Sequence, residues 1–370
     1  MKLTKKKTRS KSETRSKSET RSKSETRSKS KTKGKSSSKK QNSKILTLDA
    51  FNKLEYPYRH LAISKSQMKS DFAELRKYRG KFITYNPGKM KIAKFRNRNY
   101  LLFVESFNDH NHLHQITNYF SHKCRVVCIF NLKESENILT LFTKNKKKII
   151  KELKARKEEL TFKNINEYLY RHHRECTYFN TTMVMNILNL FKPKRWLDCS
   201  AGWGDRLVGA IAYGKCEYLG VDPSKCMQPV YKEIIKELGG ASSKKYNVVC
   251  DGFENVKVKN NHYDLVFTSP PFFNLEVYED EEEQSVEKFK TIDEWKRGFL
   301  FPLLKKSYNS LNKGGYLALY ITDFKGSSYI KDMKNYVKHK VKGLQYQGDL
   351  HFFHKENKRT IRTIYIWKKD

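Results

Sequence analysis

The chain has 370 residues, of which 38% are hydrophobic and 13% aromatic, so it can bury a core and has room for two domains. Its 76 basic and 39 acidic residues give a net charge of +37, which favours a polyanionic partner, nucleic acid before an anionic membrane. No run approaches the roughly 18 apolar residues of a membrane span, and no apolar leader follows Met1, so we expect a soluble intracellular protein without a membrane partner.

Residues 1–43 have the composition of a disordered basic tail. The first 40 residues hold 17 Lys or Arg against three Glu, and KSETRS repeats three times over residues 11–28. Without apolar residues from Thr4 to Lys40, the segment cannot bury enough surface to offset the cost of ordering. Non-specific nucleic-acid affinity, a nuclear localisation signal and an inert spacer all remain open for it.

Residues 44–165 mix helical and strand patterns, which predicts a smaller α+β accessory domain. LDAFNKL and SDFAELRKY have helical spacing. KFITYN, NYLLFVESF, CRVVCIFNL and ILTLFTK are typical of short strands, and the charged stretch 144–160 is typical of a connecting helix. We expect this domain to contact the substrate, an inference from its position in the chain alone.

Histidines and cysteines cluster in FNDHNHLHQ and SHKCRVVC within this region, but the spacing is not that of a zinc finger or ribbon, so we expect no metal. The seven cysteines are odd in number and scattered without CxxC pairs. That pattern suits a reducing compartment.

From residue 166 to 370 the pattern alternates between strands and helices. Strands are expected in RWLDC, YLGVD, NVVCD, YDLVFT and GGYLALYITD, with helical spacing in the gaps. Such alternation predicts an α/β domain with a parallel sheet covered on both faces. The last segment, residues 350–369, predicts two antiparallel strands at the edge of that sheet.

Ligands of open α/β sheets bind beyond the carboxyl ends of the strands, and three acids and a glycine turn fall there. The stretch from Asp198 to Gly204 reads DCSAGWG, in which Gly202 and Gly204 would let the backbone approach a cofactor. Asp222 follows the next strand, where an acid commonly binds ribose hydroxyls. Asp251 follows the third strand and suits an adenine amino group. An ordinary turn and helix caps are the alternative interpretation.

Adjacent prolines end the fourth strand in the sequence Ser269-Pro270-Pro271-Phe272. Proline lacks an N–H and fixes φ, so the strand stops and the carbonyls of Ser269 and Pro270 are left without a ladder partner. Those carbonyls could accept hydrogen bonds from an exocyclic amine while Phe272 stacks on a planar base. Fixed carbonyl dipoles would stabilise the positive charge that develops on the nitrogen as it is methylated.

The order DCSAGWG, GVDPS, VVCDGF, TSPPFF resembles the S-adenosylmethionine-dependent amino-methyltransferases, above all the DNA adenine-N6 and cytosine-N4 enzymes and relatives in phages and large DNA viruses. The family's (Asp/Asn/Ser)-Pro-Pro-(Tyr/Phe/Trp) signature matches at all four places. The resemblance covers residues 174–370 and implies a Rossmann-like seven-stranded domain whose last two strands form a hairpin. It also implies roles for the cofactor-binding candidates: Ser200, Gly202 and Gly204 at the methionine part, Asp222 at the ribose, Asp251 at the adenine, and Phe179 and Asn180 from the preceding helix.

We therefore predict an N-methyltransferase acting on a nucleic-acid base, DNA before RNA, with Ser269, Pro270, Pro271 and Phe272 as the catalytic residues. By the resemblance, serine ahead of the prolines favours cytosine N4 over adenine N6. Cys199 and Ser200 depart from the commoner Pro and Gly of the first motif. Two alternatives stay open: methylation of RNA or of a protein glutamine, and a non-catalytic nucleic-acid-binding or packaging protein that retains the fold. The oligomeric state is not predicted.

Overall fold

A mixed β-sheet runs through the structure, a computed structural model that describes residues 45–80, 82–83, 94–95, 98–99, 101–104, 107–130, 136–173, 175–273, 275–278, 285–324, 328–354 and 359–370. One compact unit begins at Ser43 and extends to Asp370. The tail predicted over residues 1–43 lies outside the described residues, and so does the acidic run that follows Tyr278.

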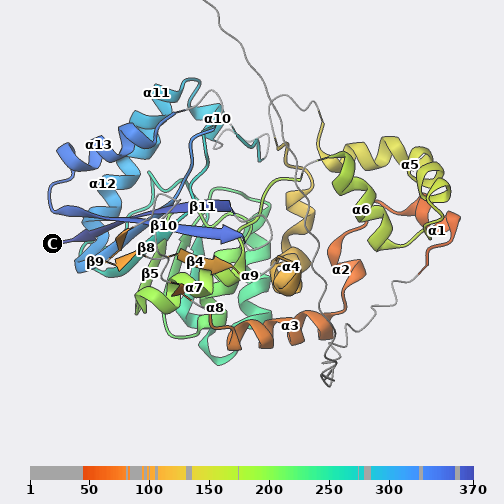
Figure 1. Cartoon of the computed structure of the whole chain (residues 1–370), viewed down its shortest axis with the longest axis horizontal. Helices are drawn as coiled ribbons and strands as arrows, with labels where there is room; N and C mark the ends of the chain where they lie inside the picture. Colours follow the sequence, from red (N-terminus) through yellow and green to blue (C-terminus); the bar gives the residue numbers. More distant parts are fainter. Residues whose placement is uncertain are drawn as a thin grey trace, which may run out of the picture. The chain divides into compact units, whose positions relative to one another are not determined.

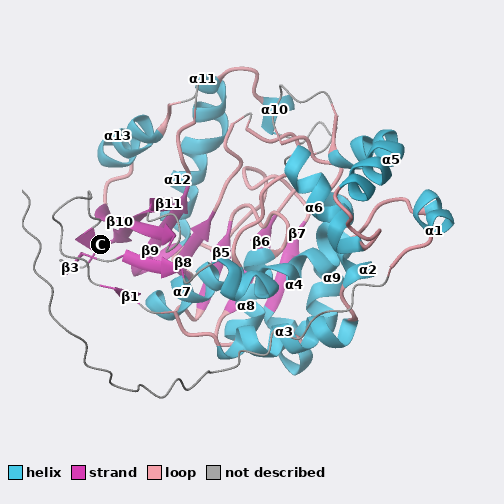
Figure 2. Cartoon of the chain, turned by 45° about the vertical axis from the view of Figure 1, so that its right-hand side comes forward, coloured by secondary structure: helices cyan, strands magenta, loops and turns pink. Residues whose placement is uncertain are grey.

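The sheet has the order β1-β4-β10-β11-β9-β8-β5-β6-β7 (Figures 1 and 2). Its strands are β1 (Phe82–Ile83), β4 (Leu101–Val104), β5 (Arg195–Asp198), β6 (Glu217–Val221), β7 (Tyr246–Val249), β8 (Tyr263–Thr268), β9 (Leu311–Tyr320), β10 (Leu344–His354) and β11 (Arg359–Lys369). From β7 to β9 all neighbours are parallel, and β11 is antiparallel to both β9 and β10. The seven strands from β10 to β7 confirm the expected Rossmann-like sheet with its terminal hairpin.

The hairpin is not at the sheet edge, contrary to the prediction. β4 pairs in parallel with β10, from His351↔Leu101 to His354↔Val104, and β1 pairs with β4. A small separate ladder joins β2 (Lys94–Phe95) and β3 (Arg98–Asn99). The sequence shows β4 as an apolar run but not its partner, because that partner lies about 250 residues further along the chain.

Alternation along the strands divides the core between two faces of the sheet. Trp196, Leu265 and Phe267 belong to the core that also contains residues of α7 (Thr181–Phe191), α8 (Asp205–Tyr213) and α9 (Met227–Leu238). Leu197 and Val266 instead join the core of α11 (Ile292–Trp295), the π-helix η2 (Lys296–Leu300), α12 (Phe301–Ser310) and α13 (Ile330–Lys340). Helices thus cover both faces, as in a parallel α/β sheet, and Figure 2 shows them on either side.

The N-terminal region does not fold as a separate unit. The two helices α3 (Lys65–Lys77) and α4 (Phe107–Arg125) bury Met68, Phe72, Leu113 and Ile116 in the same core as α7 and α8. Because β4 also joins the main sheet, the expected boundary at residue 165 does not divide the fold. The helices α1 (Leu48–Lys53), α5 (Ile138–Ala155) and α6 (Phe162–His172) bury their apolar faces in a smaller cluster of their own, on the right of Figure 1.

Two predicted strands are wrong. ILTLFTK opens the helix α5, since Asn137 caps its first turn by accepting from the Thr140 N–H, and Ile138, Phe142, Ile149 and Leu153 bury one helical face. CRVVCIFNL begins inside α4 and continues as a loop, with an isolated bridge at Ile129, as far as Phe130, while its last two residues lie outside the described part of the chain. Short apolar runs fit a buried helix as well as a strand, and burial in three dimensions decides between them.

The clustered histidines lie on α4 rather than on a strand. Across the described part of the chain, no set of three His, Cys, Asp or Glu side chains is arranged to hold a metal ion. Likewise, among those residues no helix has the length and apolar character that crossing a membrane requires. The remaining short helices are α2 (Arg59–Ala62), α10 (Ser285–Lys288) and the 3-10 helix η1 (Gly240–Lys245).

Four of the seven cysteines form disulfides, which does not fit the expectation of a reducing compartment. Cys124 at the end of α4 pairs with Cys226, and Cys128 pairs with Cys176. Their Cα atoms are 5.9 and 6.1 Å apart. The partners are 102 and 48 residues apart in sequence, which is why spacing gave no sign of them. Cys199 and Cys216 are buried free thiols, and Cys250 is exposed.

Candidate functional site

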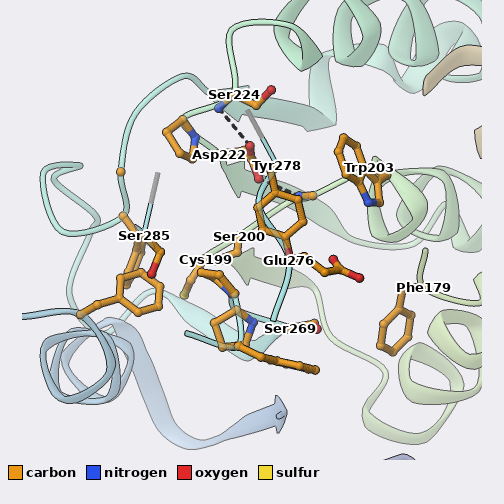
Figure 3. Close-up of a pocket in the computed structure, with 18 of the residues that line it drawn as sticks. Phe179, Cys199, Ser200, Trp203, Asp222, Ser224, Ser269, Glu276, Tyr278 and Ser285 are labelled. Carbon is orange, nitrogen blue, oxygen red and sulfur yellow. Dashed lines mark hydrogen bonds between the residues drawn. The ribbon is translucent and has the colours of Figure 1, made fainter. Parts of the chain in front are cut away.

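A cavity opens at the carboxyl ends of the parallel strands, where the sequence placed the site (Figure 3). Each strand from β5 to β9 contributes lining from the residues at or just past its end. These are Cys199, Ser200, Gly202 and Trp203 after β5, Asp222, Pro223 and Ser224 after β6, Gly252, Phe253 and Glu254 after β7, Ser269 to Phe272 after β8, and Tyr320 of β9. The remaining walls come from residues 177–179, from Asp205, Arg206 and Met227, from Leu275, Glu276 and Tyr278, and from Ser285, Lys288, Phe289 and Phe299.

The glycine turn after β5 has the backbone geometry that the motif predicts. Gly202 has φ +61° and Gly204 φ +91°, which side chains rarely adopt. Gly204 does not line the cavity. It is the N-cap of α8, and a Cβ there would lie 2.9 Å from Ile234. Gly202 lines the cavity directly, so of the two glycines it is the one that brings backbone to a ligand.

Asp222 joins the β6 loop to the glycine turn. Its Oδ2 accepts the Gly202 N–H at 2.7 Å, and its Oδ1 accepts the Ser224 N–H at 3.1 Å (Figure 3). Burial raises the pKa of this carboxyl to about 6, although the two backbone N–H groups oppose the shift. Each carboxylate oxygen has a second lone pair, so Asp222 can still accept hydrogen bonds from a ligand in the cavity.

Asp198 does not face the cavity. Its side chain is fully buried, and its Oδ2 accepts from Arg206 Nε and from the Tyr218 hydroxyl, both at 2.8 Å. Arg206, which does line the cavity, also donates to the carbonyl of Ser200. The position of Asp198 therefore fits a carboxylate that holds Arg206 and the turn rather than one that touches a ligand.

Asp251 and Asn180 also lie outside the lining. Asp251 accepts the Gly252 N–H at 2.7 Å and the Asn255 amide at 2.8 Å, so it shapes the loop whose next three residues do line the cavity. Asn180 is the buried N-cap of α7. Its neighbour Phe179 does reach the cavity. The Phe179 N–H donates to Asp205 at 3.1 Å, and the Phe179 ring lies 5.6 Å from the Arg206 guanidinium.

The double-proline segment lines the cavity with all four of its residues. β8 ends at Thr268, as expected, and the chain turns sharply at Phe273, which has φ +49°. The Phe272 ring packs edge-on against Tyr320, with centroids 5.5 Å apart. Phe272 and Tyr320 thus form an aromatic wall of the cavity beside the double-proline segment.

Sequence reasoning missed the outer wall of the cavity. Glu276 is 8% exposed, and its Oε1 accepts both the N–H and the hydroxyl of Thr177 at 2.8 Å. The adjacent Val277 exchanges two backbone hydrogen bonds of 2.9 Å with Ile129. The sequence shows an acid in the NLEVY stretch, at Glu276. Only the fold shows that this acid lines the cavity.

The other half of this wall is anchored by α4. Arg125 forms an ion pair with Glu175 at 2.6 Å and donates to the Cys176 carbonyl at 2.9 Å. The neighbouring disulfide binds Cys176 to Cys128. The arginine holds the pKa of the half-buried Glu175 well below its usual range, while burial lowers the pKa of His122 to about 4. Residues 177–179, which line the cavity, therefore follow directly on a residue that is fixed to Arg125 and Cys128.

No protein-family model and no curated protein matches this chain. Among solved structures, it is similar to the tRNA (m1A58) methyltransferase TrmI from Aquifex aeolicus, at 12% identity and a TM-score of 0.36 over 54% of this chain and 72% of that one. It is also similar to TrmN from Thermus thermophilus, at 13% identity and a TM-score of 0.37, over 52% of this chain and 49% of that one. The strand order and cavity described above define the class here: a Rossmann-like α/β fold with a site at the carboxyl ends of its strands.

Proposed function

We propose that the protein is an S-adenosylmethionine-dependent methyltransferase that acts on an exocyclic amino group of a nucleic-acid base. One observation carries the proposal: Ser269 to Phe272 share a single cavity with the Gly202 turn and Asp222. The same cavity thus holds two groups of residues. The Ser269 and Pro270 carbonyls would accept hydrogen bonds from an amine, and the Gly202 turn and Asp222 would bind a nucleoside cofactor.

The residues present suit the cofactor. Gly202 presents bare backbone to the cavity, Asp222 offers free acceptor positions for ribose hydroxyls, and Phe253 and Gly252 bound the region proposed for the adenine. Ser200 and Phe179 remain candidates for the methionine part. S-adenosylmethionine supplies a methyl group already activated as a sulfonium, so the protein binds and orients the two reactants, excludes water and provides for the proton that the amine loses.

The target base would be held by the double-proline segment. The Ser269 and Pro270 carbonyls accept hydrogen bonds from the amine, and Phe272 supports the ring plane. The dipoles of these carbonyls are fixed, so they stabilise the positive charge that develops on the nitrogen, and they need not reorient during the reaction. A base in a duplex must first swing out of the stack, at a cost of a few kcal/mol that stacking on an aromatic side chain helps to offset.

Nucleic acid is the substrate class that the charge favours. With a net charge of +37, the chain attracts the phosphate backbone, which holds a strand over the cavity without reading its sequence. Within this class we propose DNA, with cytosine N4 or adenine N6 as the acceptor, because the SPPF segment matches the signature of the DNA amino-methyltransferases that the sequence resembles. The serine in that signature favours cytosine N4.

Incubation with methyl-labelled S-adenosylmethionine and, in parallel, double-stranded DNA and total RNA tests the proposal. Digestion to nucleosides should recover the label in N4-methylcytosine or N6-methyladenine. Label in RNA or in a protein glutamine would move the substrate, whereas steeply salt-dependent DNA binding without affinity for S-adenosylmethionine would indicate a non-catalytic nucleic-acid-binding protein.

A further inference from the structure

Glu276 is a carboxylate held rigidly at the reaction end of the cavity. It follows Phe272 by four residues, and Figure 3 shows Glu276 and Tyr278 beside Ser269 and Phe179 around the same space. Both hydrogen bonds from Thr177 go to Oε1, and the Tyr278 hydroxyl also bonds to this carboxyl. The backbone pairing of Val277 with Ile129 fixes the segment on its other side. The carboxyl therefore has a defined position on the cavity wall.

Within the described part of the chain, Glu276 forms no direct ion pair of the kind that Asp198 and Glu175 form, although Arg125 acts on its charge from a longer distance. Asp198 has Arg206 at 2.8 Å and Glu175 has Arg125 at 2.6 Å. No such ion pair forms at Glu276 among the residues that the structure describes, where its hydrogen-bond donors are neutral. Burial raises the pKa of this carboxyl. A buried acid in such surroundings gains most from a positive charge that appears beside it.

We propose that Glu276 receives the proton that the target amine gives up when it is methylated. The inference rests on the proposed function. The amine nitrogen forms a bond to the methyl carbon as the bond between that carbon and the cofactor sulfur breaks, and the electron pair of the broken bond stays on sulfur. The nitrogen then carries a positive charge, and one of its protons passes to the Glu276 carboxylate. A neutral methylamine, a thioether and a protonated Glu276 remain, and the proton leaves to water when the site opens.

The geometry also assigns a preference for an unsubstituted amine. The Ser269 and Pro270 carbonyls and an ionised Glu276 are all hydrogen-bond acceptors, so they pair best with a group that offers two N–H bonds. A methylated product keeps only one of them. Monomethylated product is therefore the expected end point, and a second methylation should be slow.

Glu276→Gln is the decisive variant, because it keeps the shape and removes the base. We expect kcat to fall at least about 100-fold, within the range for general acid–base residues, while the Kd for S-adenosylmethionine measured by calorimetry changes less than threefold. The wild-type rate should fall as the pH drops through the raised pKa of Glu276, and this acid limb should vanish in the variant. Glu233→Gln on the exposed side of α9 provides the matched acid-to-amide control.

Infrared difference spectra offer a readout independent of turnover. On acidification of the free protein, Asp205, Asp222 and Glu276 should each contribute to the protonated-carboxyl absorption. The contribution of Glu276 should be missing from the spectrum of Glu276→Gln. If this variant does not fold, Thr177→Val removes one of the two Oε1 donors and leaves the acid in place. We expect it to lower kcat by less than the glutamine variant would, while S-adenosylmethionine still binds.

Three outcomes overturn the proposal. Unchanged kcat and an unchanged pH profile in Glu276→Gln would make the residue a structural link to Thr177. A tenfold weaker Kd for S-adenosylmethionine with kcat retained would make it a cofactor contact. Wild-type protein that binds S-adenosylmethionine but labels neither DNA nor RNA would remove the proposed function itself, and this failure is recognised without any variant.

Discussion

The carboxylate of Asp222 accepts the backbone N–H of Gly202 at 2.7 Å, so the two motifs that precede and follow the first crossover helix are joined before any ligand binds. A second hydrogen bond, from the Ser224 N–H, fixes the other oxygen at 3.1 Å. The carboxylate is thus preorganised on the cavity wall, and a ligand need not supply the energy to orient it.

Asp222→Asn should weaken S-adenosylmethionine binding. The amide keeps one acceptor oxygen but turns an NH₂ towards either the Gly202 or the Ser224 N–H, which costs one of the two bonds and disturbs the turn. We expect at least a tenfold higher Kd, equivalent to about 1.4 kcal/mol, measured by isothermal titration calorimetry.

Asp264→Asn is the matched control for that measurement. Asp264 also accepts two backbone N–H groups at 2.9 Å, from Lys194 and Arg195, but at the opposite ends of the strands. The melting temperature should drop in both variants. An equal loss of cofactor affinity in the two would mean that the effect of Asp222 is one of stability alone.

Phe272→Ala should strongly reduce methyl transfer and leave the cofactor affinity largely intact. The ring packs on Tyr320 and lines the cavity together with the double-proline segment. Loss of a stacking platform costs about 1–3 kcal/mol per base, which corresponds to roughly a 5- to 150-fold effect in kcat/KM before any misplacement of the amine is added.

Phe272→Tyr keeps the aromatic ring and should retain most of the activity, so comparison of the two variants separates loss of stacking from loss of folding. Full turnover in Phe272→Ala would count heavily against base stacking at this position.

Pro270→Ala should lower activity by shifting the position of the neighbouring carbonyls, since it frees φ and restores an N–H at the point where the strand must stop.

The sequence predicted the parts of the site that are local. A strand, two glycines and an acid are consecutive or nearly so around Gly202, and two prolines mark the end of β8 regardless of the rest of the fold. It could not distinguish Asp222, which lines the cavity, from Asp198, which is turned inward by Arg206 and Tyr218. Both acids end strands, and only side-chain packing separates their directions.

The outer wall could not be predicted, for a related reason. Glu276 meets Thr177 across 99 residues, and Cys128 meets Cys176 across 48. These contacts depend on how α4 packs against α7 and α8. The hydrophobic pattern within α4 does not predict which helices it packs against. Residues of the supposed accessory region thus position the outer wall of the cavity.

Reduction of the two disulfides should destabilise the protein and loosen the cavity. Cys226 follows the loop of Asp222 to Ser224, and Cys176 precedes Thr177, so each disulfide anchors a lining segment to residues 124–128. Closing loops of this length contributes roughly 4 kcal/mol each in the chain-entropy model. We expect dithiothreitol to lower the melting temperature and raise the Kd for S-adenosylmethionine.

Cys176→Ser and Cys226→Ser should reproduce these effects one segment at a time, while the exposed Cys250→Ser provides a control that leaves both disulfides intact. Identical melting curves with and without reductant, in protein shown to be oxidised by thiol titration, would contradict the prediction.

Cofactor affinity should fall as the pH drops through about 6. The folded-state pKa of Asp222 is raised to about 6 from an ordinary value of 3.8, because burial disfavours the ionised form. An acid with a raised folded pKa penalises the folded state at high pH. The unfolded chain ionises first as the pH rises from about 4, and the penalty reaches its full size above about 6.

The contribution of Asp222 to stability and its contribution to binding therefore have opposite slopes between pH 4 and 6. Its ionisation costs the free protein stability as the pH rises through this window, and His122, whose pKa is lowered to about 4, contributes the opposite slope to stability. The ionised Asp222 that appears is the better acceptor for ribose hydroxyls. Calorimetric Kd values for S-adenosylmethionine at pH 5, 6, 7 and 8 should improve up to about pH 7 and then level off. Asp222→Asn should flatten the profile, and an unchanged slope in that variant would assign the titration to another group, of which Asp205, also raised to about 6, is the nearest candidate.

Deletion of residues 1–40 should weaken nucleic-acid binding without removing methyl transfer. The segment carries 17 basic and three acidic residues, a net +14 of the total +37, and none of the residues proposed for the site. Neutralised phosphates release counterions, so the slope of log K against log salt should become shallower in the truncated protein, by about 0.9 for each duplex phosphate that the tail no longer neutralises. At low salt the affinity of the truncated protein for a duplex of random sequence should fall, and at high salt the affinities of the full-length and truncated proteins should converge.

Turnover at saturating nucleic acid should stay the same, because the cavity from Gly202 to Phe272 is unchanged. A fall in kcat on truncation would show instead that the tail reaches the reacting base, and equal salt slopes would show that it binds no phosphate.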